Sequence, residues 1–389
     1  MMRPPIVAAW CASALCFCCG IATDANGQGT TRALVAAKVP TLPVVGMGDS
    51  VDGEFDRVSS VRELADGRVI VADIIADRLY IVDWRVGTAT QFGVKGRGPG
   101  EYVEIGRVFP SRGDSSVLED PTIRKWLVMD GVRIGPPLNS TAKYTVDLFL
   151  AGVDTLGRYL EVSPHRFAKG RNGRPVPIRD FADTLVAVLV HRSGERRDTI
   201  AALRGSYRGH AEARKVSNGV AMDYWFYSRI RTEDQTVLFP DGWISVVRSD
   251  PYTIEWHPPK GAAHTRRTLP FDSVRVDDLQ KRHAMYRTWD AATRPLFKPE
   301  EMPGWPTVLP PFERDALLAF PEGWLGIVRT PDARVQKRYV DVVGRDGILR
   351  FRLELPDEER VVGVSASYIY SVRMDSDDVE HLVRRRRPR

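Results

Sequence analysis

The residues best suited to metal or acid–base chemistry are seven histidines, and their spacing favours no site within one segment. None lies two or four positions from another, and the sequence has no HExxH motif: they are His165, His191, His210, His257, His264, His283 and His381. The densest carboxylate cluster, Asp375 to Glu380, lacks the glycine and the ligand spacing of an EF-hand loop. We interpret this cluster as a solvated turn. A metal site would have to be assembled from distant segments.

A glycine-rich loop, Gly93 to Gly100 with Lys95 inside it, has the composition of a phosphate-binding loop. It follows one β segment and precedes another, so no helix N-terminus is offered to a phosphate. The sequence also has no G-x-x-x-x-G-K-[ST] motif and no G-x-S-x-G motif centred on serine. We therefore predict that Gly96, Gly98 and Gly100 form a structural connection, and we assign no catalytic residue.

The N-terminus has the pattern of a secretory signal. Arg3 precedes an apolar stretch from Ile6 to Ile21, and small residues follow at Ala22, Ala25 and Gly27. The apolar stretch of about 16 residues is short for a bilayer span of roughly 20. We predict a signal peptide over residues 1–27, export to the periplasm or the exterior, and no transmembrane span in the mature chain. A retained N-terminal anchor is the alternative.

All four cysteines, Cys11, Cys16, Cys18 and Cys19, lie inside this predicted signal. The mature chain would then have no cysteine, which excludes disulfides, thiol catalysis and cysteine-ligated zinc. A lipoprotein signal is a further alternative because Leu15 stands three residues before Cys18. Phe17 occupies a position where such signals require a small residue, and we do not favour lipid anchoring.

The net charge of +6 arises mostly at the C-terminus, where the last six residues, from Arg384, contain five arginines. The rest of the chain is close to neutral. We predict one folded domain over residues 28–385 and a solvated basic tail at 386–389. An anionic envelope surface would be the partner of this tail if it binds one. Nucleic acid is not an expected partner of an exported protein.

The elements that must position any site are short β segments. Residues 58–100 contain two apolar runs, Val69–Ala72 and Leu79–Val82, and a tight turn at Asp66-Gly67. Glycine tolerates the positive φ of such turns. The runs barely alternate between apolar and polar residues, as expected of strands that are buried on both faces. This segment predicts a four-stranded antiparallel sheet.

The same hairpin recurs along the chain, which indicates a repeat architecture. Phe239 to Arg248 (FPDGWISVVR) matches Phe320 to Arg329 (FPEGWLGIVR) position for position. Six repeats are predicted, at about 58–100, 103–145, 146–203, 234–272, 312–356 and 360–385. Residues 277–290 are predicted to form a helix after the fourth repeat, with Leu279, Arg282, Tyr286 and Trp289 on one face.

These residues carry a resemblance to a known family. Val71-Ala72-Asp73, Arg78 to Asp83 and the GxGPGEY loop resemble an NHL-type repeat, and the order of the six repeats resembles the bacterial secreted or periplasmic six-bladed β-propellers. The resemblance implies an all-β fold of four-stranded blades around a central channel, with one short helical insertion after blade four. It also implies ring closure, which we expect from Leu42–Val45 joining the sheet of the final blade.

Most of the conspicuous side chains are interpreted as structural. Asp73, Arg78 and Asp83 are expected to tie the strand ends of neighbouring blades together through charge-assisted hydrogen bonds. Trp243 and Trp324, at matched positions of two repeats, are expected to pack between blades.

The best candidate for a binding surface is the aromatic run Met222–Tyr227, with Tyr224, Trp225, Phe226 and Tyr227. We therefore predict an exported, non-enzymatic propeller that binds a protein, peptide or glycan through its loop faces and the 204–233 insertion, as a monomer and without a cofactor. The alternative is a metal-dependent hydrolase or lyase, with calcium or zinc at the channel. A structural subunit of an envelope complex is a third possibility.

Overall fold

The first sheet shows how the sequence forms a blade. In the computed structural model, a hairpin joins β3 (Val58–Glu63) to β4 (Val69–Asp73), with Gly67 at a φ of 83°. Two further strands, β5 (Arg78–Asp83) and β6 (Thr88–Phe92), are added in order and complete an antiparallel sheet. All residues of β4 are buried, which agrees with a strand covered on both faces.

The structure describes most of the chain from residue 39 onward. The described ranges are 39–44, 48–51, 53–123, 125–138, 149–164, 167–169, 175–177, 184–191, 196–205, 210–217, 220–227, 230, 232–261, 265–288, 298–301 and 304–388. For 164–177, 210–227 and 288, only the backbone belongs to this description. The predicted signal peptide lies outside it. Within the described residues, no helix is long and apolar enough to cross a membrane.

Five more sheets have the same consecutive antiparallel order. Blade two consists of β9 (Val108–Pro110), β10 (Ser115–Asp120), β11 (Lys125–Asp130) and β12 (Arg133–Pro137). Blade three consists of β13 (Phe149–Val153), β14 (Tyr159–Pro164), β17 (Thr184–Val190) and β18 (Arg197–Arg204). Blade four consists of β21 (Gln235–Leu238), β22 (Ile244–Ser249), β23 (Tyr252–His257) and β24 (Thr265–Thr268). Blade five contains β25 (Phe312–Ala319), β26 (Leu325–Arg329), β27 (Lys337–Val343) and β28 (Leu349–Pro356). Blade six contains β29 (Glu359–Val364), β30 (Tyr368–Met374) and β31 (Glu380–Arg386).

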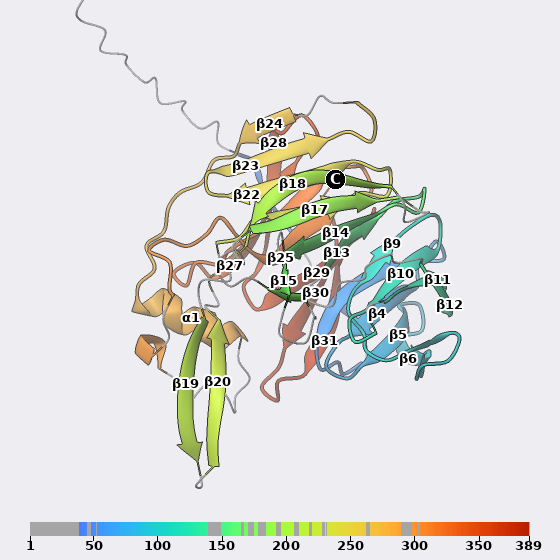
Figure 1. The fold of residues 1–389 in the computed structure, drawn as a ribbon, viewed down its shortest axis with the longest axis horizontal. Coiled ribbons are helices and arrows are strands. Elements are labelled where there is room, and N and C mark those ends of the chain that lie inside the picture. Colours follow the sequence, from blue (N-terminus) through green and yellow to red (C-terminus); the bar gives the residue numbers. More distant parts are fainter. Residues whose placement is uncertain are drawn as a thin grey trace, which may run out of the picture. The chain divides into compact units, whose positions relative to one another are not determined.

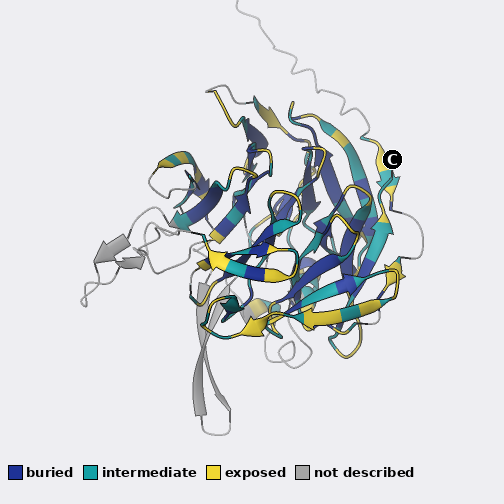
Figure 2. Ribbon diagram, turned by 90° about the vertical axis from the view of Figure 1, so that its right-hand side faces the viewer, coloured by how far each residue is buried: buried dark blue, intermediate teal, exposed yellow. Residues whose placement is uncertain are grey.

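The first strands of the six blades form a closed ring. Each contacts the first strand of the next blade, and β29 of blade six returns to β3 of blade one. The chain is a six-bladed β-propeller (Figure 1). The predicted fold class is confirmed, while the likeness to NHL-type repeats remains a resemblance of sequence. Five apolar clusters fill the spaces between neighbouring blades, and Figure 2 shows these buried residues within the sheets.

The N-terminal segment closes the ring differently from the prediction. β2 (Asp49–Ser50) pairs antiparallel with β31 and supplies the fourth strand of blade six. β1 (Thr41–Pro43) instead pairs parallel with β28, at the outer edge of blade five. The expectation that Leu42–Val45 joins the final blade was wrong. The physical reason is that Leu42 and Val44 pack against the apolar cluster between blades four and five.

The C-terminal arginines belong to the folded domain, because β31 extends to Arg386. Arg384 forms an ion pair with Asp49 at 2.9 Å, and its guanidinium lies over Trp84 and Tyr368. Arg385 pairs with the buried Glu359. The Arg387 side chain is only 9% exposed and pairs with a glutamate of blade five, Glu322. The predicted solvated tail began at residue 386, and this prediction was wrong for Arg387, whereas Arg386 is exposed. Arg384 and Arg385 lie within the predicted domain and pair with carboxylates of the blade-six sheet.

Several elements lie outside the blades. The glycine-rich loop contains the short parallel pair β7 (Val94–Lys95) and β8 (Glu101–Tyr102). Two hairpins pair separately from the blades, β15 (Phe167–Lys169) with β16 (Pro175–Pro177) and β19 (His210–Ser217) with β20 (Val220–Tyr227). The helix α1 (Asp278–Thr288) and a short 3₁₀ turn, η4 (Pro299–Glu301), follow blade four.

The helix confirms the predicted insertion, and the predicted face of Leu279, Arg282 and Tyr286 is exposed, while Trp289 lies outside the described residues. Asp277 accepts a hydrogen bond from the Gln280 N–H at 3.1 Å and so caps the helix. Leu279 and Tyr286 are exposed, whereas Gln280 and Met285 are buried. The buried amide of Gln280 is satisfied because it donates to Asp332 and accepts from the backbone of residue 333. Polar contacts rather than an apolar stripe therefore dock this helix.

Candidate ligand-binding channel

The centre of the ring contains a cavity of about 710 Å³, which we call the channel pocket. It reaches from the turns that join first to second strands, around Ala65, Asp241 and Ala366, to Arg107, Glu119 and Asp315. Its volume lies within the range of sites that bind small ligands. Mostly aliphatic side chains form its walls, among them Val61, Val153, Leu203, Val237, Leu317 and Val362.

The first strand of blade five contains a bulge that places charge in this pocket. Pairing between β25 and β26 is interrupted between Phe312 and Leu317. Asp315, inside the interruption, has a φ of 56°, a left-handed conformation that is uncommon for residues other than glycine. Its side chain is 67% exposed although it lines the channel. Bulges and strained residues of this kind concentrate at functional sites.

Blade four holds this bulge in place. The side-chain amide of Gln235 donates to the Glu313 carbonyl at 2.7 Å and accepts from the Ala316 N–H at 2.9 Å. Both groups lie in the interrupted part of β25, where the ladder to β26 does not satisfy them. Gln235 is therefore a positioning residue for Asp315.

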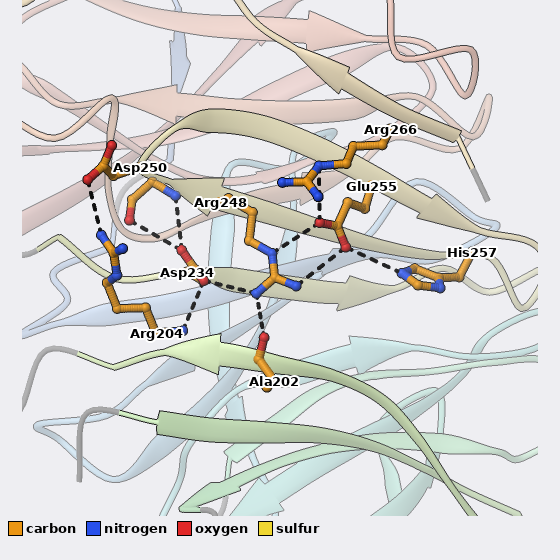
Figure 3. A network of polar contacts seen from close by, with 9 residues as sticks. Ala202, Arg204, Asp234, Arg248, Asp250, Glu255, His257 and Arg266 are labelled. Carbon is orange, nitrogen blue, oxygen red and sulfur yellow. Dashed lines mark hydrogen bonds and ion pairs between the residues drawn. The ribbon is translucent and has the colours of Figure 1, made fainter. Parts of the chain in front are cut away.

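In blade four, the position equivalent to Asp315 is occupied by Asp234, whose carboxylate is buried. Asp234 and Asp315 each stand five residues before the phenylalanine of the repeated FP-acidic-GW turn. Asp234 is buried and accepts hydrogen bonds from the Ser249 N–H at 3.0 Å and the Arg204 N–H at 2.9 Å. Arg248 adds an ion pair at 3.0 Å. Figure 3 shows this network, which joins blades three and four.

Blade five has the matching residues but uses them differently. Arg329, which corresponds to Arg248, pairs with the buried Asp341 of its own blade. Thr330, which corresponds to Ser249, has a buried hydroxyl with no hydrogen-bond partner among the described residues. Asp315 has thus left the site that its counterpart occupies, and its carboxylate faces the channel instead.

Across the channel, Asp315 faces two residues of blade two. Arg107 Nη1 lies 3.7 Å from Asp315 Oδ1, and its guanidinium stacks over Phe109 at 5.3 Å. Burial raises the pKa of Glu119 to about 7, and the charge of Asp315 adds to this rise. A hydrogen bond from the Leu150 N–H and the charge of Arg107 oppose it. A carboxyl group near half-ionisation therefore lies beside an arginine at the depth of the pocket.

A second charged cluster lies at the start of the bulge, outside the lining of the pocket. Burial raises the pKa of Glu313 to about 7, opposed by the charges of Arg287, Arg360 and Arg57. Its closest partner is the fully buried Arg338, at 2.8 Å. Within the described part of the chain, no group of three or more His, Cys, Asp or Glu side chains is arranged to hold a metal ion.

The predicted structural residues have defined places. Asp73 is buried and accepts from the N–H groups of Asp56, Arg57 and Ala76. Asp120 repeats this arrangement in blade two, where it accepts from Val103 and Ile123. These carboxylates fix the backbone that leads into their own blades.

The other two members of the predicted set make local contacts. Arg78 is exposed and interacts with Tyr80 of its own strand, and this interaction is the main cause of its raised pKa. Asp83 accepts from Arg85 in the following turn. Among the described residues, their contacts remain within blade one, so the expected tie between neighbouring blades was wrong for them. The reason is that Arg78 and Asp83 lie at the two ends of β5, where groups of their own strand and of the following turn are within reach.

The acidic cluster near the C-terminus is divided between two roles. Asp375 accepts from the N–H groups of Asp377 and Val379 in an exposed turn, as its composition predicted. Glu380 is buried instead, and it accepts from the Val58 N–H of blade one at 2.7 Å. Arg360 forms an ion pair with Glu380 at 2.6 Å. Glu380 therefore joins blades six and one rather than lying in solvent.

The structure also shows the contacts of the glycines and tryptophans that the sequence predicted to be structural. Gly98 donates to the Glu101 carboxylate at 2.7 Å, an added Cβ at Gly96 would lie 2.0 Å from the same carboxylate, and Gly100 has a φ of 78°. Trp243 stacks with Trp256 and lies under Arg345 of blade five at 4.9 Å. Trp324 packs on Phe351 of its own blade.

The predicted aromatic surface, Tyr224, Trp225, Phe226 and Tyr227, lies on β20. The backbone of this strand pairs with β19, while its side chains are outside the described residues. A binding role for these aromatics stays a prediction. The channel residues were missed because their signal is a difference between two matched repeats rather than a motif.

Comparisons with known proteins found matches among solved structures alone. No protein-family model matches the chain, and no curated protein matches its sequence. Among solved structures, it is similar to a gluconolactonase of Xanthomonas campestris, with 12% identity, a TM-score of 0.44, and 88% of this chain and 99% of the other covered. A member of the DUF4221 family of Bacteroides vulgatus has 7% identity and a TM-score of 0.43, with 88% and 97% covered. A virginiamycin B lyase of Staphylococcus aureus has 9% identity and a TM-score of 0.38, with 87% and 98% covered. Identities this low indicate nothing about the activity of the present chain.

Proposed function

We propose that this protein is an exported binding propeller whose channel pocket receives a side chain of a peptide partner. The loops around the mouth of the pocket would contact the rest of the peptide. The observation that carries the proposal is Asp315, which is held on a bulge by Gln235 and exposed inside an otherwise aliphatic pocket. Such a pocket suits a ligand with an apolar stem and a polar end.

Stability alone does not account for this arrangement. Blade four shows that the same repeat can bury its aspartate in a network of hydrogen bonds. Blade five instead has a residue with positive φ and a buried threonine hydroxyl without a partner among the described residues. Features of this type reduce stability by about 1–3 kcal/mol each, and they persist where function requires them. Export is part of the proposal and is supported by the signal pattern of residues 1–27.

A blocking variant tests the proposal. Ala366 lies on an exposed turn that lines the mouth of the pocket. We expect Ala366→Trp to fold normally and to lose binding to a library of defined peptides that bind the unmodified protein. Ile75 is 68% exposed, lies on a β4–β5 turn and does not line the pocket, so Ile75→Trp is the matched control. Equal peptide binding by both variants would show that the pocket is not the binding site.

A hydrolase or lyase acting in the same pocket is the second candidate. It is favoured by Glu119, because a carboxyl group with a pKa of about 7 is suited to general acid–base catalysis. Under this alternative, Glu119→Gln would abolish turnover while leaving ligand affinity within a factor of about two. Metal analysis of the purified protein would show whether calcium or zinc participates.

A further inference from the structure

We infer that the side chain received by the channel pocket is a primary ammonium group on an alkyl stem, that of a lysine. This inference rests on the proposed function and adds the charge of the ligand to it. Three observations carry it, namely the charge of the pocket lining, the partners of its arginines and the open carboxylate of Asp315.

The first observation is the charge balance. Among the described residues, seven carboxylates and four arginines line the pocket, and no lysine or histidine does. Asp234 is balanced by Arg248, which lies outside the lining, and with Glu119 protonated five carboxylates then face four arginines, so the lining stays negative by one charge. Aliphatic walls of low polarity focus such a field along the channel and raise the local concentration of cations.

The second observation is that the arginines near the mouth are already engaged by the protein. Arg62 donates to the carbonyls of Glu63 and Gly113, at 2.7 and 2.6 Å. Arg345 pairs with Asp241 and stacks on Trp243. These guanidinium groups are not available to an anionic ligand without breaking contacts between neighbouring segments.

The third observation is the incomplete pairing of Asp315. Its nearest cationic atoms are Arg107 Nη1 at 3.7 Å and Arg314 Nε at 3.8 Å, both beyond hydrogen-bonding distance. The carboxylate thus retains acceptor positions, and Glu119 lies on the same side of the ring as Arg107. An ammonium group carries three donors on a small head and can bind both carboxylates.

The aliphatic walls define the rest of the ligand. Val237, Leu317 and Val362 come from three different first strands and line the path from the mouth to Asp315. A chain of four methylene groups can lie against such walls while its charged end reaches the carboxylates. A lysine side chain combines both properties, whereas an aspartate or glutamate side chain would bring its charge to a negative site.

Three small probes test the inference on the full mature chain: n-hexylammonium, n-hexanoate and n-hexanol, with affinities measured by NMR titration. We expect hexylammonium to bind about tenfold more tightly than hexanoate. Asp315→Asn should reduce this ratio to below about threefold, and Asp315→Lys should reverse it. Asp378, which also has a positive φ of 61° but lies in a turn of blade six away from the pocket, provides the control Asp378→Asn. That control should leave the ratio unchanged.

The outcomes separate this inference from the proposed function. Equal binding of all three probes, or tighter binding of hexanoate, would overturn the ammonium preference and leave a binding pocket in place. No binding of any probe would contradict the pocket itself as well. Binding of hexylammonium that survives Ala366→Trp would place the cation outside the channel and would also overturn the inference.

Discussion

The Asp315 carboxylate of blade five lies 3.7 Å from the Arg107 guanidinium of blade two, on the opposite side of the ring. The two blades are three positions apart, so this single contact spans the channel. At this distance the pair is an electrostatic contact without a hydrogen bond, and a ligand group can displace it at little cost. The channel is thus closed at this level by charge rather than by packing.

The matched aspartates predict a separation of stability from binding. Asp234→Asn should lower the free energy of unfolding by about 2–4 kcal/mol, because Asp234 is buried and accepts charge-assisted hydrogen bonds. Asp315→Asn should change it by less than about 0.5 kcal/mol, because its ion pairs are long and exposed. Urea denaturation of both variants measures the difference. Similar losses in the two would contradict the distinct roles assigned to the two carboxylates.

Gln235 is predicted to affect binding through the position of Asp315. Gln235→Ala leaves the Glu313 carbonyl and the Ala316 N–H without partners, and should cost about 1–3 kcal/mol of stability and weaken hexylammonium binding. Gln280 is a buried glutamine whose amide also holds two groups, and it does not line the pocket. Gln280→Ala should therefore lower stability without weakening binding. Loss of binding in both variants would indicate a general loss of structure instead.

Stability is predicted to fall as the pH rises from about 5 to 8. Burial raises the pKa values of Glu119 and Glu313 from 4.5 to about 7. The folded chain therefore holds these protons more tightly than the unfolded chain, and their ionisation opposes folding. The penalty is absent well below pH 4.5 and complete above about pH 7, on the order of 3 kcal/mol for each carboxyl group.

Glu119→Gln isolates one part of this pH dependence. The variant should gain stability relative to the unmodified protein as the pH rises, and the gain should be near zero at pH 4.5. Chemical denaturation at several pH values measures it. A difference between the two proteins that stays constant across this range would refute the assignment.

Arg384 is predicted to stabilise the closure of the ring. Arg384→Ala removes the ion pair with Asp49 and the cation–π contacts with Trp84 and Tyr368, at 4.6 and 4.7 Å. We expect a loss of about 1–3 kcal/mol. Arg386 is exposed on the same strand and provides the control, since Arg386→Ala should change stability by less than about 0.5 kcal/mol. Thermal unfolding of both variants checks the prediction, and equal losses would speak against it.

Local patterns were sufficient to predict the blades. The Asp66-Gly67 turn and the buried runs beside it define a sheet without any distant information. The match between residues 239–248 and 320–329 then extends that sheet to a repeat. The helix after blade four was also predicted from its own residues, and Asp277, which directly precedes it, caps it in the structure.

The rest depends on contacts that local patterns do not encode. Residues 384–387 have the composition of a solvated tail. In the structure, Arg384 stacks on Trp84 of blade one, Arg385 pairs with Glu359 of its own blade, and Arg387 pairs with Glu322 of blade five. Likewise, FPDGW and FPEGW predict the same environment for Asp234 and Asp315. What distinguishes these two is the bulge, which Gln235 holds from the neighbouring blade. The similar sequences of these two repeats therefore gave no indication that blade five has a bulge where blade four has none.

The pairing of β2 with β31 has a consequence for the folding rate. Asp49 and Arg384, which meet in this pair, are 335 positions apart in the chain. The antiparallel strands of the first five blades pair with their neighbours along the chain, and β1 is a fifth strand added at the outer edge of blade five. The sheet of blade six, in contrast, obtains its fourth strand through a contact of nearly maximal sequence separation. Loop closure of this length is slow, and high contact order slows folding as a whole. A circular permutant with β2 placed directly after β31 would convert this step into a local hairpin, and should fold faster to the same ring.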